Sequence, residues 1–106
     1  MKKAVWLSYD LSVQGDYESL YEWLDNLDAK ECGNSVAFFK YEVASGMVLK
    51  NEIKKDIEKN VKLGARDRVY IMYRDAKKNM KGAFIVGKRK ASPWKGYGRG
   101  RQEIDE

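Results

Sequence analysis

The chain has 106 residues with a net charge of +5, of which 43% are hydrophobic and 35% charged, a composition typical of one globular domain. It contains no histidine and a single cysteine, Cys32, which excludes an internal disulfide, histidine-containing zinc sites and a Ser-His-Asp triad. No apolar run approaches the ~18 residues of a membrane span and no signal peptide is recognisable, so we expect a cytoplasmic protein with no membrane partner.

The first half of the chain predicts a strand, a helix and a second strand. Residues 3–9 are mostly apolar on both faces, which favours a central strand. Asp16 is suited to cap a helix, and apolar side chains then recur at helical spacing from Tyr17 to Leu27. Residues 35–43 are rich in β-branched and aromatic types, which favours a second strand.

The second half predicts a helix followed by a hairpin. Ile53, Ile57 and Val61 recur every four residues, which indicates an amphipathic helix over residues 47–62, and we expect Gly64 to end it as a left-handed cap. Two apolar segments, residues 69–73 and 83–86, flank a polar, lysine-rich turn. The short connection between them favours an antiparallel pair.

These elements predict an α+β fold in which two helices cover one face of an antiparallel or mixed sheet. A ferredoxin-like β-α-β-β-α-β sandwich needs one further strand, and we expect either a bend within residues 35–46 to supply it or residues 83–90 to pair at the sheet edge as an added element. We assign residues 1–87 to this ferredoxin-like, mostly antiparallel domain. Residues 88–106 then form an extended, basic, glycine-containing tail.

Two short motifs carry a family resemblance. The first strand closes on Tyr9-Asp10, and Asn34-Ser35-Val36-Ala37-Phe38 stands in the second strand. Over about residues 3–73 the chain resembles the CRISPR-associated protein 2 family and its SinR-like relatives, and VapD-type toxins share the fold. The resemblance implies a small ferredoxin-like homodimer.

The resemblance also implies a role for Asp10. In the family, the matching aspartate faces its symmetry mate across the dimer and holds a divalent metal such as Mg²⁺, so Asp10 would be both metal ligand and catalytic residue of an endonuclease. This chain departs from the family because its helix over residues 16–27 carries no arginine and its tail differs. A binding or adaptor role without catalysis stays open. So does a purely structural Asp10 that caps the loop after its strand.

The positive charge is concentrated in one segment. Residues 74–101 carry ten Lys or Arg against one acid, Asp75, whereas residues 1–73 are almost neutral. Cations interleaved with aromatic side chains are typical of surfaces that hold phosphates and stack bases. We therefore predict that DNA or RNA is bound by the following residues: Lys88, Arg89, Lys90, Trp94, Lys95, Tyr97, Arg99 and Arg101.

Other functions fit the same pattern. The basic segment is also compatible with an acidic protein partner, or with a tail that only aids solubility. The chief alternative is a non-enzymatic interaction protein, such as a phage- or mobile-element-encoded inhibitor that docks on a larger protein. A further alternative is sequestration of a nucleotide in a groove of the dimer.

Overall fold

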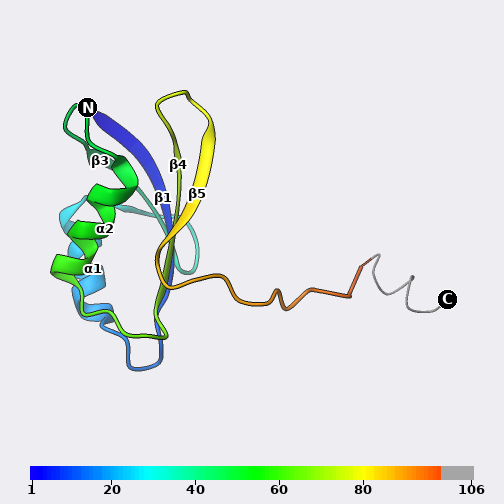
Figure 1. The fold of residues 1–106 in the computed structure, drawn as a ribbon. Helices are drawn as coiled ribbons and strands as arrows, with labels where there is room; N and C mark the ends of the chain where they lie inside the picture. The colour runs from blue at the N-terminus through cyan, green and yellow to red at the C-terminus, as the bar shows by residue number, and fades with distance from the viewer. Residues whose placement is uncertain (99–106) are drawn as a thin grey trace.

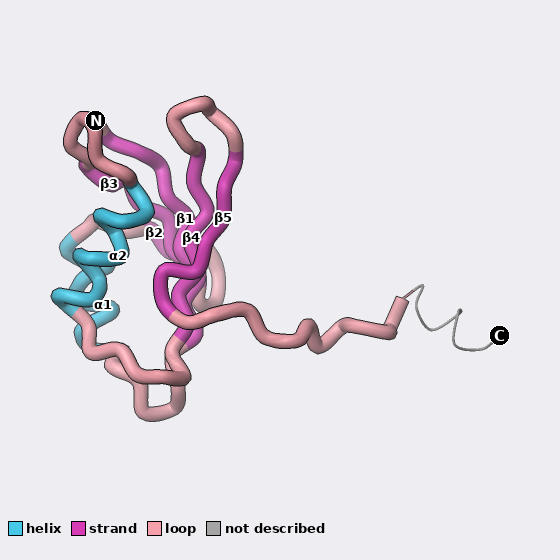
Figure 2. The backbone as a smooth tube through the Cα atoms, in the orientation of Figure 1, coloured by secondary structure: helices cyan, strands magenta, loops and turns pink. Residues whose placement is uncertain are grey.

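The computed structural model describes residues 1–98, which form one five-stranded antiparallel sheet and two helices (Figures 1 and 2). In chain order the elements are β1 (Lys2–Asp10), α1 (Tyr17–Asn26), β2 (Lys30–Glu31), β3 (Val36–Glu42), α2 (Leu49–Asn60), β4 (Arg68–Arg74) and β5 (Met80–Val86). The strands lie in the order β2-β3-β1-β4-β5, so the first strand is central, as predicted. The α+β class with two helices and an antiparallel sheet is confirmed.

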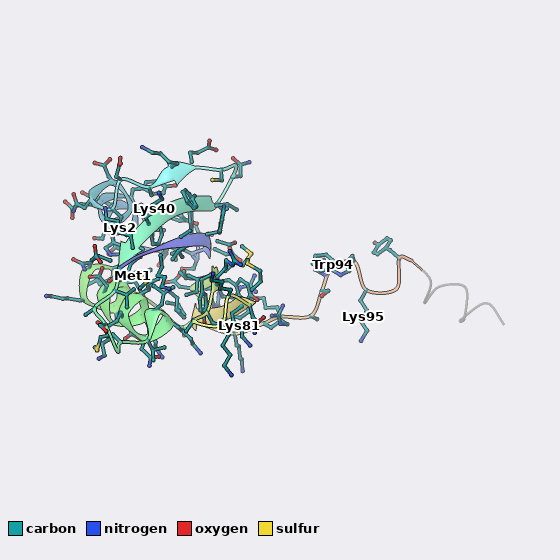
Figure 3. All side chains as sticks on the ribbon, turned by 90° about the horizontal axis from the view of Figure 1, so that it is seen from above. Met1, Lys2, Lys40, Lys81, Trp94 and Lys95 are labelled. Atoms are coloured by element: carbon teal, nitrogen blue, oxygen red, sulfur yellow. The ribbon has the colours of Figure 1, made fainter. Side chains whose placement is uncertain are left out.

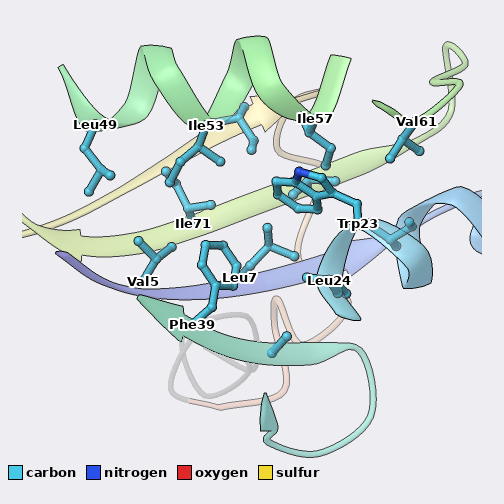
Figure 4. Packing of buried hydrophobic residues seen from close by; sticks show 14 of the residues in the cluster. Val5, Leu7, Trp23, Leu24, Phe39, Leu49, Ile53, Ile57, Val61 and Ile71 are labelled. Atoms are coloured by element: carbon cyan, nitrogen blue, oxygen red, sulfur yellow. The ribbon is translucent and has the colours of Figure 1, made fainter. Parts of the chain in front are cut away.

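The core lies between the sheet and the two helices. Because side chains alternate along a strand, Val5 and Leu7 of β1 are fully buried on the helix side while Trp6 faces the other way. Figure 4 shows Val5 and Leu7 beneath the inner face of α2, where Ile53 and Ile57 are also fully buried. Burial of each such aliphatic side chain contributes about 2 kcal/mol.

The predicted cap of the first helix is confirmed. Asp16 Oδ1 accepts a hydrogen bond from the backbone N–H of Ser19 at 3.1 Å, which satisfies one of the free donors at the start of α1. Asp16 Oδ2 accepts a second bond from the N–H of Lys62 at 3.0 Å. One carboxylate therefore joins the start of α1 to the segment that leaves α2.

The end of the second helix differs from the prediction. Helix α2 is confirmed but spans Leu49–Asn60, and its cap residue Val61 is extended, with φ −126° and ψ 133°. The assignment of Gly64 as a left-handed cap was wrong. Its N–H instead donates to the carboxylate of Asp67 at 2.7 Å, so a side chain closes this turn.

A polar bridge connects both helices to β3. Asp56 Oδ2 accepts hydrogen bonds from Trp23 Nε1 at 3.1 Å and from the Tyr41 hydroxyl at 2.9 Å. Burial, and then the hydrogen bond to Asp56, raise the pKa of Tyr41, which therefore remains a neutral donor. The bridge satisfies two polar groups at the border of the core.

The additional strand lies in a segment without a periodic pattern of apolar residues. It is β2, only two residues long, and it pairs with β3 through Lys30 opposite Phe38 and Glu31 opposite Ala37. The expected bend within residues 35–46 was therefore wrong, since residues 36–42 form one strand. The expected edge pairing of the last strand is confirmed, because β5 pairs antiparallel with β4.

The sheet face opposite the helices has no layer over it within residues 1–98 (Figures 1 and 2). Trp6 and Phe38 form one aromatic pair on this open face, with ring centroids 4.8 Å apart. After β5 the chain leaves the body, and Trp94 and Lys95 stand away from it (Figure 3). This segment is not extended throughout, because the N–H groups of Lys95 and Tyr97 close turns on the carbonyl oxygens of Ser92 and Trp94. Neither helix of the described residues has the length and apolar character needed to cross a bilayer.

Candidate nucleic-acid interface

A hollow of about 660 Å³ lies where the segment before β4 meets the segment after β5. It is lined by cationic side chains from both segments, and none of the described residues that line it is acidic. We call it the cationic groove, and its lining residues are Ala65, Arg66, Arg68, Gly87, Lys88, Arg89 and Lys90. Because β4 and β5 are antiparallel, the start of one strand lies beside the end of the other and brings these cations together.

Gly87 allows the two segments to approach closely. Its φ of +73° lies in the left-handed region, which favours glycine. A Cβ at this position would stand 2.6 Å from the carbonyl oxygen of Asp67 and 2.9 Å from Cγ of Arg68. The path that carries residues 88–90 past Arg68 therefore depends on the absence of a side chain at residue 87.

Asp67 fixes the other wall of the cationic groove. Its side chain is only 2% exposed, and its carboxylate accepts hydrogen bonds from the N–H groups of Ser12 at 2.8 Å and Gly64 at 2.7 Å. Burial tends to raise the pKa of Asp67, but these two hydrogen bonds outweigh it, and the pKa is lowered. With Asp67 held inward, Arg66 and Arg68 on either side of it line the groove.

A second hollow, of about 290 Å³, opens on the uncovered face of the sheet. We call it the aromatic hollow, and it is lined by Ser8, Asp10, Arg68, Tyr70, Phe84 and Arg89. It shares two of these residues, Arg68 and Arg89, with the cationic groove, so the two hollows are neighbours.

Two rings and two guanidinium groups form the walls of the aromatic hollow. Tyr70 and Phe84 lie opposite each other on β4 and β5, with centroids 4.8 Å apart and ring planes inclined by 70°. The guanidinium carbon of Arg89 lies 5.7 Å from the Tyr70 centroid and 5.4 Å from that of Phe84. That of Arg68 lies 5.9 Å from Phe84. These distances are within the range of cation–π attraction.

Asp10 is placed at the end of β1, directly opposite Arg68 of β4. Its side chain is 62% exposed, and its Oδ2 accepts a hydrogen bond from Arg68 Nη2 at 2.9 Å. Arg68 Nε is buried and has no hydrogen-bond partner among residues 1–98. Among residues 1–98, the Asp10 carboxylate is held by this ion pair with Arg68.

The predicted metal site at Asp10 stays a prediction. Among residues 1–98, no three side chains of the cysteine, aspartate and glutamate kind gather as ligands for one ion. The resemblance placed the second carboxylate on a symmetry mate, and a single chain does not contain that mate. Carboxylate ligands remain the type that Mg²⁺ prefers.

The predicted phosphate-binding residues fall into two groups. Lys88, Arg89 and Lys90 line the cationic groove, whereas Trp94, Lys95 and Tyr97 lie farther along the segment that follows β5. Trp94 and Tyr97 are 71% and 72% exposed. The other two predicted residues, Arg99 and Arg101, lie outside the described residues.

The sequence alone predicted only half of the candidate site. Arg66 just before β4, Arg68 at its start, and the rings of Tyr70 and Phe84 were not predicted as part of a site. One available signal was the predicted hairpin, because an antiparallel pair brings the residues before its first strand close to those after its second. Arg66 and Arg68 are therefore expected beside the Lys88-Arg89-Lys90 run.

Comparison with known proteins adds no relative: no family model, curated protein or solved structure matches the chain.

Proposed function

We propose that this chain binds nucleic acid through the cationic groove. The observation that carries the proposal is the convergence of five cations from two separate segments on one hollow: Arg66, Arg68, Lys88, Arg89 and Lys90. A polyanion whose charges are closely spaced gains affinity from such a cluster because each neutralised phosphate releases condensed counterions. Arginine adds bidentate hydrogen bonds to phosphate oxygens.

The arrangement of the elements supports the interpretation of the fold as ferredoxin-like. The order β1-α1-β2-β3-α2-β4 together with the strand order β2-β3-β1-β4 fits the split β-α-β pattern, with β5 as an added edge strand. A ferredoxin-like fold is in keeping with the resemblance to the CRISPR-associated protein 2 family. Under this proposal the protein is a small homodimer with a binding or adaptor role. A weak Mg²⁺-dependent nuclease activity at Asp10 would accompany that role.

A charge-matched pair of variants tests the groove. Arg66→Ala with Lys88→Ala removes two positive charges from the groove, and Lys54→Ala with Lys59→Ala removes two from the exposed face of α2. Binding of fluorescently labelled single-stranded DNA, single-stranded RNA and duplex DNA is measured by anisotropy at several salt concentrations. We expect the groove variant alone to weaken binding and to lower the salt slope by about 1.4 on single strands, about 0.7 for each lost phosphate contact.

Two results would overturn the proposal. One is the absence of salt-dependent binding to any of the three polymers. The other is an equal loss in the α2 variant, because non-specific attraction to a basic protein depends on total charge rather than on its position.

A second candidate function has its own observation. Trp94 and Tyr97 are largely exposed on the segment that leaves the body, and exposed aromatic side chains are enriched at protein–protein interfaces. They favour a non-enzymatic interaction protein that docks this segment on a larger partner. Truncation after Gly87 separates the two functions. It removes three of the five groove cations and should abolish nucleic-acid binding. Unchanged nucleic-acid binding would indicate instead that the removed segment binds a protein partner.

A further inference from the structure

We propose that the aromatic hollow receives one unpaired nucleobase, so that the interface prefers single-stranded nucleic acid over duplex. The inference rests on the proposed function, because the cationic groove would hold the phosphates on either side of that base. The juxtaposition that carries it is the pair of rings, Tyr70 and Phe84, beside the guanidinium of Arg89 on an uncovered sheet face.

The walls of the hollow suit the faces of a base. Nucleobases stack on aromatic rings and on planar guanidinium groups whatever their sequence, because every base has a π face. Tyr70 and Phe84 are half-buried rather than part of the core, which lies on the other side of the sheet. Both line the aromatic hollow, so a ligand that enters it would meet these rings and the Arg89 guanidinium beside them.

The rim of the hollow suits the edge of a base. The Asp10 carboxylate is exposed beside the rings and accepts hydrogen bonds, as from the exocyclic amino group of cytosine. The Ser8 hydroxyl donates or accepts, and Arg68 donates. Within the described residues 1–98, Arg68 Nε is buried and has no hydrogen-bond partner, and an acceptor that reached it would relieve the cost of that unsatisfied donor.

The size of the hollow is in keeping with a single base. Its volume of about 290 Å³ lies at the lower limit of known small-ligand pockets, which begin at roughly 300 Å³. In a duplex, each base is stacked between neighbours and has no free face, so it must be unpaired and unstacked before it can enter a pocket. A duplex can therefore use the cationic groove but not the aromatic hollow.

The two hollows together match the parts of a nucleotide. They share Arg68 and Arg89, which places the ring walls directly beside the remaining groove cations. In a nucleic acid the charged phosphate is likewise next to the base it carries. A base in the hollow would therefore leave its own phosphates at the groove.

A matched pair of aromatic substitutions tests the inference. Phe84→Leu removes one ring from the hollow, and Phe38→Leu removes a ring of the Trp6–Phe38 pair on the same open face but outside the hollow. Leucine keeps each site apolar, and thermal unfolding followed by circular dichroism checks that both variants fold. The probes are a labelled single strand, the same strand with one abasic position, and a duplex of equal phosphate number.

We expect Phe84→Leu to weaken single-strand binding roughly tenfold, the size of one base–aromatic stack, and to leave duplex binding unchanged. Phe38→Leu should change neither. For an oligonucleotide too short to offer a second base to the hollow, an abasic central position should lower the affinity of the wild-type protein by a similar factor. Phe84→Leu should not lower the affinity for that abasic strand any further.

Failure of the inference is distinguishable from failure of the proposed function. If single strand and duplex bind equally and Phe84→Leu behaves like Phe38→Leu, the hollow takes no base although the groove holds phosphates. If no polymer binds, the proposed function itself is wrong. A change in oligomeric state by size-exclusion chromatography in Phe84→Leu, with unchanged binding, would overturn the inference in favour of a second copy that covers this face.

Discussion

The ring of Tyr70 lies directly over Gly82 of the neighbouring strand. A Cβ built on Gly82 would stand 2.7 Å from Cζ of Tyr70 and closer still to its hydroxyl oxygen, so even alanine would displace the ring. In the sheet, Gly82 pairs with Met72 and Phe84 pairs with Tyr70, which places the ring of Tyr70 diagonally across β5. A missing side chain on one strand therefore shapes the wall of the aromatic hollow on the next.

Gly82→Ala is expected to reduce single-strand binding without a large loss of stability. The far end of the tyrosine side chain can rotate away from the new methyl group, so the free energy of unfolding should fall by less than about 1 kcal/mol. The displaced ring should weaken single-strand binding by a factor similar to Phe84→Leu and leave duplex binding unchanged. Urea denaturation and anisotropy measure the two effects. Single-strand binding at the wild-type level would contradict this role of Gly82.

Gly87→Ala is expected to weaken binding to single strands and duplex alike. The substitution combines a left-handed backbone with a clash against Asp67 and Arg68, and both push residues 88–90 away from Arg66. Gly46→Ala is the matched control, because Gly46 also has a positive φ, +83°, but its Cβ would meet nothing within 4 Å. Both variants should lose about 1 kcal/mol of stability from backbone strain, and Gly87→Ala should lose more because of its clash. Only Gly87→Ala should lose affinity in the anisotropy assay.

Asp10→Ala should separate metal-dependent cleavage from binding. The substitution removes the predicted metal ligand, so any Mg²⁺-dependent cleavage of labelled DNA or RNA should disappear. Without Mg²⁺, binding of duplex DNA should rise about twofold, because Arg68 is released from its ion pair for phosphates. Cleavage that persists in the variant would exclude Asp10 as the metal ligand. Weaker duplex binding would show instead that the ion pair holds Arg68 in its binding position.

Asp56→Ala should destabilise the fold by roughly 2 to 3 kcal/mol, because two partly buried donors, on Trp23 and Tyr41, lose their acceptor. Glu58→Ala removes a carboxylate from the exposed face of the same helix and should change stability by less than about 0.5 kcal/mol. Urea denaturation monitored by tryptophan fluorescence measures both. Equal free energies of unfolding for the two variants would mean that the hydrogen bonds to Asp56 make no net contribution to stability.

The lowered pKa of Asp67 predicts a loss of stability in acid. A carboxyl group whose pKa is lower in the folded state stabilises the fold above its unfolded pKa of about 3.9, and this contribution is lost as the pH falls through the lower folded pKa. The free energy of unfolding should therefore decline below about pH 4. Asp67→Asn should be less stable at pH 7 and show a shallower decline. An unchanged slope in the variant would assign the acid sensitivity to other carboxylates.

The parts of the fold that follow from the sequence are those with local signals. The four-residue recurrence of Ile53 and Ile57 is enough to specify α2, and Asp16 is recognisable as a cap from its position before Tyr17. The strand β2 has no such signal, since two residues cannot show an alternation. It forms because β3 offers it a pairing edge, which is a tertiary effect.

The candidate site was only partly predictable for a similar reason. A run such as Lys88-Arg89-Lys90 is visible in any charge profile, but Arg66 belongs to a segment with balanced local charge. Its position beside the run depends on the register of β4 and β5 and on the close approach at Gly87. Likewise, the sequence identifies Phe84 only as a strand residue. Its exposure to a ligand depends on the absence of a helix over its face of the sheet, which only the structure of residues 1–98 shows.

The carboxylate of Asp16 accepts hydrogen bonds from the N–H groups of Ser19 and Lys62, and so links the first turn of α1 to the residue two positions beyond α2. If fraying of the first turn of α1 displaces Asp16, the amide of Lys62 loses its acceptor, so we expect both ends to open to solvent in the same event. Native-state hydrogen exchange would then register matched opening free energies at two places 43 residues apart. The helix layer would thus respond to a disturbance as a whole, while the sheet face that carries the candidate interface remains formed.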